Sequence, residues 1–420
     1  MHNNPALPWY RKLHIQVFIA MLLGAFVGKL GDGAVLPYID WIGTIFVRLL
    51  RMMIVPLVFA SIVSGVASVG GGRTLGRLFS KTLGYYVLSS TLAVLVGLVV
   101  VNVLKPGLGA DFGAAASQTL PELSTPSSPL DLLIDMVPLN VVSAAANGDM
   151  LSLILFSILL GASIAVLPEK PRSTLMGVVD AFFQAVMKMT SWIIMILPLG
   201  VFSLIARAVG TLGFEEFKAL GMYMVTIATG LTLHLFLVLP LLLMLLGKIK
   251  PSIHFRNMLD PLITAFSSSS SAATLPVTMR TVEEKVGVSN KVSSFVLPMG
   301  ATVNMDGTAL YECAGVLFIA QGLGIELTLL QQGTVVLTAI LASIGAAAVP
   351  SAGLVIIFLV LESVNLRGPQ VDLMVGAMLA IDRPLDMYRT SVNVFSDSCG
   401  AAIIARSEGE TNVDAEVVSG

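Results

Sequence analysis

A row of charged and polar side chains near the C-terminal end lies in a stretch whose surroundings are otherwise apolar. The seven residues are Asp382, Arg383, Asp386, Arg389, Thr390, Asn393 and Asp397. On an α-helix they would fall within an arc of about 120° and extend about 22 Å along the axis. Ionisable groups inside a membrane span are costly unless they pair and face a bundle interior or a water-filled cavity. The row therefore indicates an ion or substrate pathway, and the alternative is a set of salt bridges that only hold helices together.

The composition places the chain among membrane proteins with several spans. Of its 420 residues, 55% are hydrophobic and only 12% are charged, and the mean hydropathy is +0.89. Apolar segments long enough to cross the lipid bilayer recur from Ile15 to Ile404. The net charge of −2 gives no reason to expect a nucleic-acid partner. Cys313 and Cys399 lie in apolar segments, so we expect buried thiols and neither a disulfide framework nor a zinc site.

The candidate spans and the basic residues between them predict a topology. The spans cover residues 13–31, 38–68, 82–104, 129–167, 174–210 and 219–247, and the longest of them require tilt or breaks. Lys and Arg gather in alternate connections, which predicts cytoplasmic N- and C-termini in a protein of the plasma (inner) membrane. The loop at 107–129 contains no basic residue and is predicted to be external. The polar tail at 407–420 is predicted to be disordered.

Two further apolar segments read as helical hairpins that enter and leave the membrane on one side. The first has basic residues at both ends, and its centre is the serine run 267–271 followed by Pro276. Non-helical backbone at membrane depth is tolerated only where it is buried in protein or lines a wet cavity. A flexible serine linker is the alternative. The second segment, 329–365, has small residues and Pro350 at its centre.

Each hairpin precedes a polar helix, at 288–321 and at 370–406. This arrangement predicts an inverted repeat with a binding site where the broken helices meet. The fold class is therefore an all-α polytopic membrane protein with eight transmembrane helices and two re-entrant hairpins.

The first of these polar helices contains an internal polar break. Asn304, Asp306, Gly307 and Thr308 follow closely on one another, and Glu312 lies one turn further on. An unwound turn would expose backbone carbonyls and hard oxygen ligands of the kind that Na⁺ requires. A kink held by interhelical hydrogen bonds is the alternative.

Four segments carry a resemblance to a known family. They read SSSSSAATLPVTM, NMDGTALYE, ASIGAAAVP and DRPLDMYRTSVNVFSD. On these motifs the chain resembles the dicarboxylate/amino acid:cation symporters, which include archaeal aspartate transporters and excitatory amino acid transporters. The resemblance implies a homotrimer that works by an elevator mechanism. It also implies a scaffold from residues 1–68 and 129–210 and a transport domain from 82–104 and 219–406.

The resemblance also implies roles for individual residues. The substrate pocket would be formed by Ser270, Ser271, Thr308, Val349, Gly353, Asp386, Arg389, Thr390 and Asn393, with Arg389 on the side-chain carboxylate of the substrate and Asp386 on its amino group. Such a site fits an acidic amino acid, because a planar guanidinium binds a carboxylate with two hydrogen bonds.

Three Na⁺ sites are implied in the same way. They would use Gly300, Asn304, Asn393 and Asp397; carbonyls near Thr302, Ser343, Ile344 and Ala346; and Tyr86, Ser89, Ser90, Asn304 and Asp306. No other cofactor is expected. Glu312 stands where excitatory members carry glutamate and archaeal members glutamine, so we expect it to carry a coupled proton, because burial favours a neutral carboxyl group.

Several positions depart from the pattern of the family. A second arginine is expected near the pocket, and this chain has Ser269 and Met387 at the two places where relatives carry it. K⁺ counter-transport therefore stays open. Tyr388, Ser396 and Ala348 also replace smaller residues, which bears on pocket size and on the motion of the second tip.

The leading hypothesis is an Na⁺-driven and H⁺-coupled importer of L-glutamate or L-aspartate. The same machine could instead carry a C4-dicarboxylate or a neutral amino acid. An anion channel is an alternative from a different class. An intramembrane serine hydrolase is a third class, for which only His234 is expected at membrane depth, with no triad spacing in view.

Overall fold

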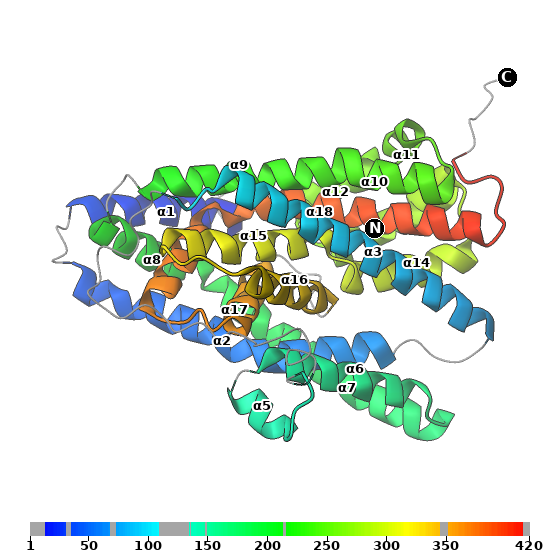
Figure 1. Ribbon diagram of the computed structural model, residues 1–420, viewed down its shortest axis with the longest axis horizontal. Helices are drawn as coiled ribbons and strands as arrows, with labels where there is room; N and C mark the ends of the chain where they lie inside the picture. The colour runs from blue at the N-terminus through cyan, green and yellow to red at the C-terminus, as the bar shows by residue number, and fades with distance from the viewer. Residues whose placement is uncertain are drawn as a thin grey trace, which may run out of the picture.

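The regular secondary structure that the computed structural model describes is helical. The described residues are 13–30, 35–67, 73–108, 134, 136–147, 149–212, 216–344 and 352–414. The helices are α1 (Leu13–Leu30), α2 (Leu36–Ala67), α3 (Arg73–Leu104), α5 (Val141–Asn147), α6 (Met150–Ala165), α7 (Glu169–Met195), α8 (Leu197–Leu212), α9 (Glu216–Leu233), α10 (Leu239–Leu242), α11 (Pro251–Asn257), α12 (Leu259–Ser268), α13 (Ser271–Thr281), α14 (Asn290–Val303), α15 (Asp306–Gly322), α16 (Leu329–Ile344), α17 (Ala352–Ser363) and α18 (Pro369–Ser407). Three π-helical turns are η2 (His234–Val238), η3 (Leu243–Gly247) and η4 (Val282–Val286). Figure 1 shows most of the long helices running along the long axis of the molecule.

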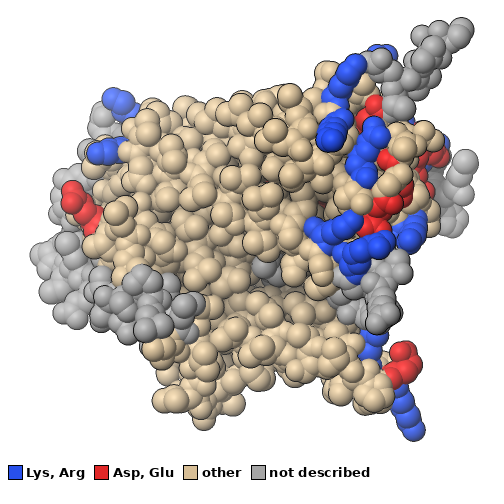
Figure 2. Space-filling model, turned by 45° about the vertical axis from the view of Figure 1, so that its right-hand side comes forward, with Lys and Arg blue, Asp and Glu red and all other residues tan. Residues whose placement is uncertain are grey.

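The length and surface of the helices are those of a multi-pass membrane protein. Four helical stretches among the described residues are long and apolar enough to cross a bilayer: Leu36–Ala67, Arg77–Leu104, Glu169–Met195 and Lys218–Gly247. Charged side chains on the face drawn in Figure 2 gather at the two ends, and a wide band without charge separates them. An apolar band of this kind is what lipid tails require of the surface they contact.

The helices pack into two groups. In one group α1 lies against α8, and α2 lies against α6, α7 and α8. In the other group α3 packs on α9 and α15, while α18 packs on α12, α14 and α15. The contact between α1 and α8 is close because Gly24 and Gly28 are four residues apart on α1. A Cβ at either glycine would come within 2.5 Å of a backbone oxygen of α8.

The two groups meet where α8 packs on α18 and α2 packs on α17, and an arginine of α2 adds a polar contact there. Arg51 forms an ion pair with Asp372 at the start of α18, and its guanidinium carbon lies 4.8 Å from the ring centre of Phe358 on α17. The second hairpin and α18 therefore both contact α2 through one side chain.

The first predicted hairpin is present as α12 and α13, which pack against each other. Its tip lies within the serine run: Ser269 adopts a left-handed conformation with φ of 52°, and Ser270 is extended. The Ser270 side chain accepts a hydrogen bond from the backbone N–H of Ala273 at 3.2 Å, which caps the start of α13. The serines therefore form the break between two helices rather than a linker.

The second hairpin and the polar break are also present. The helices α16 and α17 pack together, and the residues between them, 345–351, lie outside the described part of the chain. The helix that follows the first hairpin is interrupted at Asn304 and Met305, whose φ values of −104° and −117° with positive ψ end α14 before α15 begins. The break falls at the predicted position.

The two longest predicted spans are broken, as their length requires. The segment 174–210 is not one helix, because α7 ends at Met195 and α8 begins at Leu197, with Pro198 in its first turn removing a backbone donor. The segment 129–167 is interrupted as well, since α5 ends at Asn147 and α6 begins at Met150.

Part of the tail at 407–420 differs from its prediction. Residues 408–414 pack against the rest of the protein and Asp414 is buried, whereas residues 415–420 lie outside the described part of the chain. The contacts of residues 408–414 are described below.

Candidate functional site

The predicted polar row is buried along the middle of α18. Of its seven members, six have side chains that are almost wholly inaccessible: Asp382, Asp386, Arg389, Thr390, Asn393 and Asp397. Arg389 is the largest fully buried side chain among the described residues. Burial of this many polar groups on one stripe means that each of them requires a partner.

Arg389 lies at the centre of a buried charge cluster. Its guanidinium donates to Oδ1 of Asp386 from Nη2 at 2.9 Å and from Nε at 3.2 Å, and Nη2 lies 3.2 Å from Oδ1 of Asp382. The guanidinium carbon stands 4.1 Å from the ring centre of Tyr311. Asp386 also lies 3.3 Å from Nη1 of Arg383.

One nitrogen of Arg389 has no partner in the described part of the chain. Nη1 is buried and forms no hydrogen bond there. A Cβ placed on Gly353, in the first turn of α17, would come within 3.0 Å of Nη1 and of the guanidinium carbon. Because a guanidinium stays charged, a buried free N–H of this kind marks the place of an anionic partner. That place lies between α18 and the second hairpin.

The helix break in front of α15 packs directly on this cluster. Asn393 accepts a hydrogen bond from the backbone N–H of Gly307 at 2.7 Å and lies 3.3 Å from the hydroxyl of Thr308. Thr390 donates to the backbone oxygen of Asp386 at 2.7 Å. The structure therefore brings Thr308, Asp386, Arg389 and Asn393 together with Gly353.

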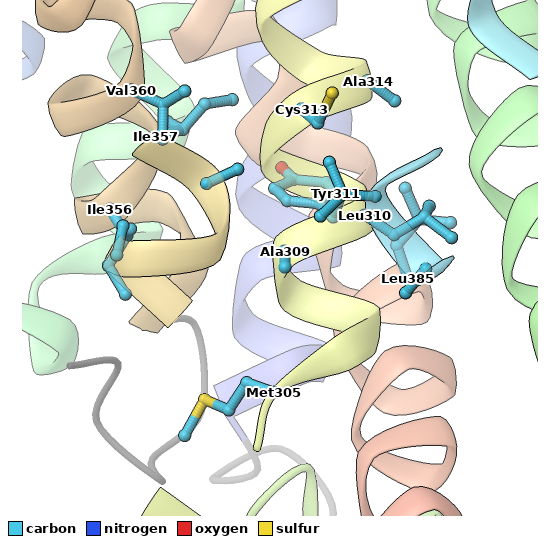
Figure 3. Packing of buried hydrophobic residues seen from close by; sticks show 14 of the residues in the cluster. Met305, Ala309, Leu310, Tyr311, Cys313, Ala314, Ile356, Ile357, Val360 and Leu385 are labelled. Carbon is cyan, nitrogen blue, oxygen red and sulfur yellow. The ribbon is translucent and has the colours of Figure 1, made fainter. Parts of the chain in front are cut away.

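Figure 3 shows the packing that holds these elements in place. Ile356, Ile357 and Val360 of α17 lie beside α15, where Tyr311 and its neighbours form part of one continuous buried core. Ile357 approaches so closely that a Cβ on Gly315 of α15 would meet it at 2.7 Å. Tight packing of this kind fixes the distance between the second hairpin and Arg389.

Of the remaining predicted substrate residues, Ser270 and Ser271 are buried at the first tip. Both arms of that hairpin, α12 and α13, pack against α18, and Ser391 donates to the backbone oxygen of Leu262 at 3.2 Å. Val349 lies outside the described residues.

A second buried polar cluster surrounds the helix break. Asn304 donates to Oδ1 of Asp397 at 2.9 Å and to the hydroxyl of Ser396 at 3.0 Å, and its own oxygen accepts from Ser89 at 3.2 Å. Asp306 accepts from Ser90 at 2.7 Å. These contacts connect α3, the break and α18.

Gly300 and Tyr86 complete the cluster. A Cβ on Gly300 would come within 2.5 Å of both the Asp397 carboxylate and the Tyr86 hydroxyl. Tyr86 donates to the backbone oxygen of Val296 at 2.7 Å. The residues expected at two of the three Na⁺ sites are therefore close together.

The residues expected at the remaining Na⁺ site are not joined in this way. The hydroxyl of Thr302 bonds to Met299, and the hydroxyl of Ser343 bonds to Ile340, each within its own helix. Ile344 ends α16, and Ala346 lies outside the described residues.

Sequence reasoning missed two members of the second cluster. His234 starts the π-helical turn η2, and its Nε2 lies 3.0 Å from Oδ2 of Asp306. Ser396 donates to the same oxygen at 2.6 Å. A lone histidine inside an apolar span was the available signal for His234, whereas nothing in the sequence indicated that it would face Asp306.

Glu312 is buried on α15, one turn beyond Thr308. Both of its carboxylate oxygens are without a hydrogen-bond partner in the described region. An ionised carboxylate without a hydrogen-bond donor is costly in such a place.

Comparison with known proteins shows similarity to one family of transporters. The profile of the sodium:dicarboxylate symporter family matches residues 13–407. The chain is 36% identical to an excitatory amino acid transporter of Caenorhabditis elegans, over 94% of this chain and 88% of that protein. It is 34% identical to a proton/sodium-glutamate symport protein of Bacillus caldotenax, over 94% of each, and 35% identical to excitatory amino acid transporter 3 of Mus musculus, over 88% of this chain and 79% of that protein.

Fold and site together define a multi-pass membrane transport protein built around broken helices, rather than an enzyme. The family match covers nearly the whole chain and therefore also shows which family of transporters it is. The chain belongs to the sodium:dicarboxylate symporter family.

Proposed function

We propose that the protein is a secondary active symporter that imports L-glutamate or L-aspartate together with Na⁺ and H⁺. The observation that carries this proposal is the buried Nη1 of Arg389, which has no partner in the described part of the chain and lies beside Gly353 of the second hairpin. The side-chain carboxylate of an acidic amino acid supplies the missing acceptor. The names of the relatives, which include a glutamate symport protein, point to the same substrate class.

Asp386 supports an amino acid over a dicarboxylate. Its carboxylate faces the same cluster and is shared between Arg389 and Arg383. An incoming ammonium group would bind a buried carboxylate well, whereas a dicarboxylate would bring a second negative charge to it. A neutral amino acid would in turn leave the guanidinium nitrogen unpaired.

The second cluster supports Na⁺ as the coupling ion. Asp306 and Asp397 place two buried carboxylates around Asn304, and in the described chain neither forms an ion pair with a Lys or an Arg. A desolvated negative site lined by hydroxyl and amide oxygens attracts a hard cation. Na⁺ binding there would compensate the cost of burying the two charges.

The proton is assigned to Glu312. Its carboxyl group is buried on the same helix as Thr308, and a proton taken up with the substrate would keep it neutral during transport. K⁺ counter-transport is not part of the proposal, although Arg383 lies close enough to Asp386 to serve as the second arginine of the pocket.

Movement and assembly follow the family pattern in this proposal. The group of helices around α2 and α8 would be the scaffold, at residues 1–68 and 129–210. The group around α18, at 82–104 and 219–406, would move across the membrane as an elevator. In this proposal the protein forms homotrimers in the plasma (inner) membrane. Its N- and C-termini are cytoplasmic, and the charge-rich end in Figure 2 lies on the cytoplasmic side.

Uptake of labelled L-glutamate and L-aspartate into proteoliposomes tests this function. Na⁺, pH and K⁺ gradients are imposed separately, with succinate and serine as competitors. The proposal expects uphill accumulation that requires inward Na⁺ and that only the acidic amino acids inhibit. Stronger inhibition by succinate would favour a dicarboxylate carrier, and flux without saturation or accumulation would favour a channel.

A further inference from the structure

The segment that follows α18 bends back across one end of the molecule, and we call residues 408–414 the strap. Figure 1 shows the end of α18 at the same end of the protein as α11. The backbone oxygens of Thr411 and Val413 accept hydrogen bonds from the Arg406 guanidinium at 2.7 and 2.8 Å, which turns the strap back toward the helices. The Val413 side chain is fully buried. The strap is therefore a packed part of the fold.

Asp414 binds both sides of the base of the first hairpin. Its Oδ2 lies 2.6 Å from Nδ1 of His254, and its Oδ1 accepts from Asn257 at 2.8 Å, both on α11 before the hairpin. Its backbone N–H donates to the oxygen of Val286 at 2.7 Å, in η4 after the hairpin. One residue thus joins the segments that enter and leave the hairpin.

His254 extends this connection to α18. Its Nε2 lies 3.0 Å from the hydroxyl of Ser398, and the ring is fully buried. The pattern holds for a neutral ring that donates to Asp414 and accepts from Ser398. It also holds for a charged ring that donates to both, because Ser398 lies 2.7 Å from the backbone oxygen of Phe395 and can donate there instead.

The order Ser398, His254, Asp414 resembles that of a hydrolase triad, but the surroundings exclude that use. Ser398 is fully buried within α18, so no substrate carbonyl can reach its oxygen. The cluster is therefore a structural connection.

Two glutamates fix the rest of the strap. The Glu408 carboxylate lies 2.6 Å from Nζ of Lys81 and 2.6 Å from Nη2 of Arg77, both on α3, and these bonds hold the pKa of Glu408 below its usual range. Glu410 accepts from the backbone N–H and the hydroxyl of Ser289, directly before α14, at 2.8 and 2.5 Å. The strap consequently touches α3, the hairpin base and the start of α14.

We propose that the strap is a clasp that fixes the base of the first hairpin, with Asp414 and His254 as positioning residues for its tip. The tip lies at the far end of α12, about 15 Å from the base, so a rotation of about 6° at the base would move it about 1.5 Å. A displacement of that size is enough to spoil a binding site. The consequence for transport rests on the proposed function, in which Ser270 and Ser271 contact the substrate.

Hydrogen–deuterium exchange on the purified full-length protein tests the clasp without any substrate. Asp414→Ala should raise exchange of the amides in α11, η4 and both hairpin arms at least tenfold, with α1 and α8 unchanged. Asp414→Asn, which keeps one acceptor oxygen, should restore part of the protection. Glu284→Ala is the matched control, because Glu284 is an exposed acid on the same π-turn and its side chain bonds to Arg280 alone among the described residues. Unchanged exchange in Asp414→Ala would overturn the proposal.

Uptake kinetics provide the second readout. Asp414→Ala should raise the KM for the amino acid more than threefold while its dependence on Na⁺ stays as in the wild type. A KM like that of the wild type together with loosened amides would show that the clasp does not position the tip. If Asp414→Ala cannot be purified folded, Asn257→Ala removes one of the two carboxylate bonds together with the bond from Asn257 to the backbone oxygen of Lys285 in η4. Full protection of η4 in that variant would overturn the clasp.

Discussion

Gly353→Ala tests the assignment of the substrate carboxylate to the space beside Arg389. The new Cβ would lie 3.0 Å from both Nη1 and the guanidinium carbon, so the buried arginine would have to shift by a few tenths of an ångström. Overpacking of this kind typically costs about 1–3 kcal/mol. The added methyl group also occupies the place that we assign to the carboxylate.

If this cost falls on binding, it corresponds to a rise in KM of about 5- to 150-fold, since about 1.4 kcal/mol is a factor of ten. The assay is the initial rate of labelled L-aspartate uptake into proteoliposomes at saturating Na⁺. Gly333→Ala is the matched control, because Gly333 lies on α16 of the same hairpin and a Cβ there meets nothing within 4 Å. The control should keep the KM of the wild type.

The result that would refute the reasoning is a KM for Gly353→Ala within twofold of the wild type in a protein that expresses and folds normally. The carboxylate would then bind elsewhere, and the free nitrogen of Arg389 would need another partner. A fall in maximal rate with an unchanged KM would also count against this carboxylate site, because it would show that the substitution affects movement of the hairpin and not substrate binding.

Three further substitutions address the pocket and the ions. Arg389→Cys should abolish uptake of acidic amino acids and admit neutral ones, measured with labelled aspartate and serine. Because it leaves Asp382 buried without its cation and Asp386 with Arg383 as its remaining cation, we also expect a loss of about 3–5 kcal/mol in stability, measured by thermal unfolding. Asp397→Asn should raise the Na⁺ concentration for half-maximal uptake about tenfold or more, as expected for loss of a charged ligand; an unchanged Na⁺ curve would remove this residue from the ion site. Glu312→Gln should transport without stimulation by an inward proton gradient, and a pH response equal to that of the wild type would contradict its role as proton carrier.

The elements that sequence alone located are those with a local physical cause. The serine run ends one helix and caps the next, and the break at Asn304 falls at the residues that weaken a helix. The stripe on α18 was predictable because helical period and apolar surroundings together require burial. Each of these inferences depends on a few neighbouring residues.

The contacts that sequence did not reveal join segments far apart in the chain. His234 meets Asp306 across 72 residues, and His254 meets Asp414 across 160, and no periodicity encodes such pairs. The strap was misjudged because its composition is that of a solvated tail, whereas its order depends on partners supplied by α3, α11 and α14. The position of the break at Ile196 was not located because apolar residues continue on both sides of it.

The ion pair between Arg51 and Asp372 affects the equilibrium between the two end states of the proposed movement. Both side chains are about 30% exposed, so the pair contributes on the order of 1 kcal/mol or less. If the group around α18 slides past α2 as proposed, this pair and the contact of Arg51 with Phe358 must separate in every cycle. A contact of that strength shifts the balance between the two end states by about fivefold at most. Arg51 would thus bias the resting population of the transporter by up to that factor while adding little to the barrier that each crossing must overcome.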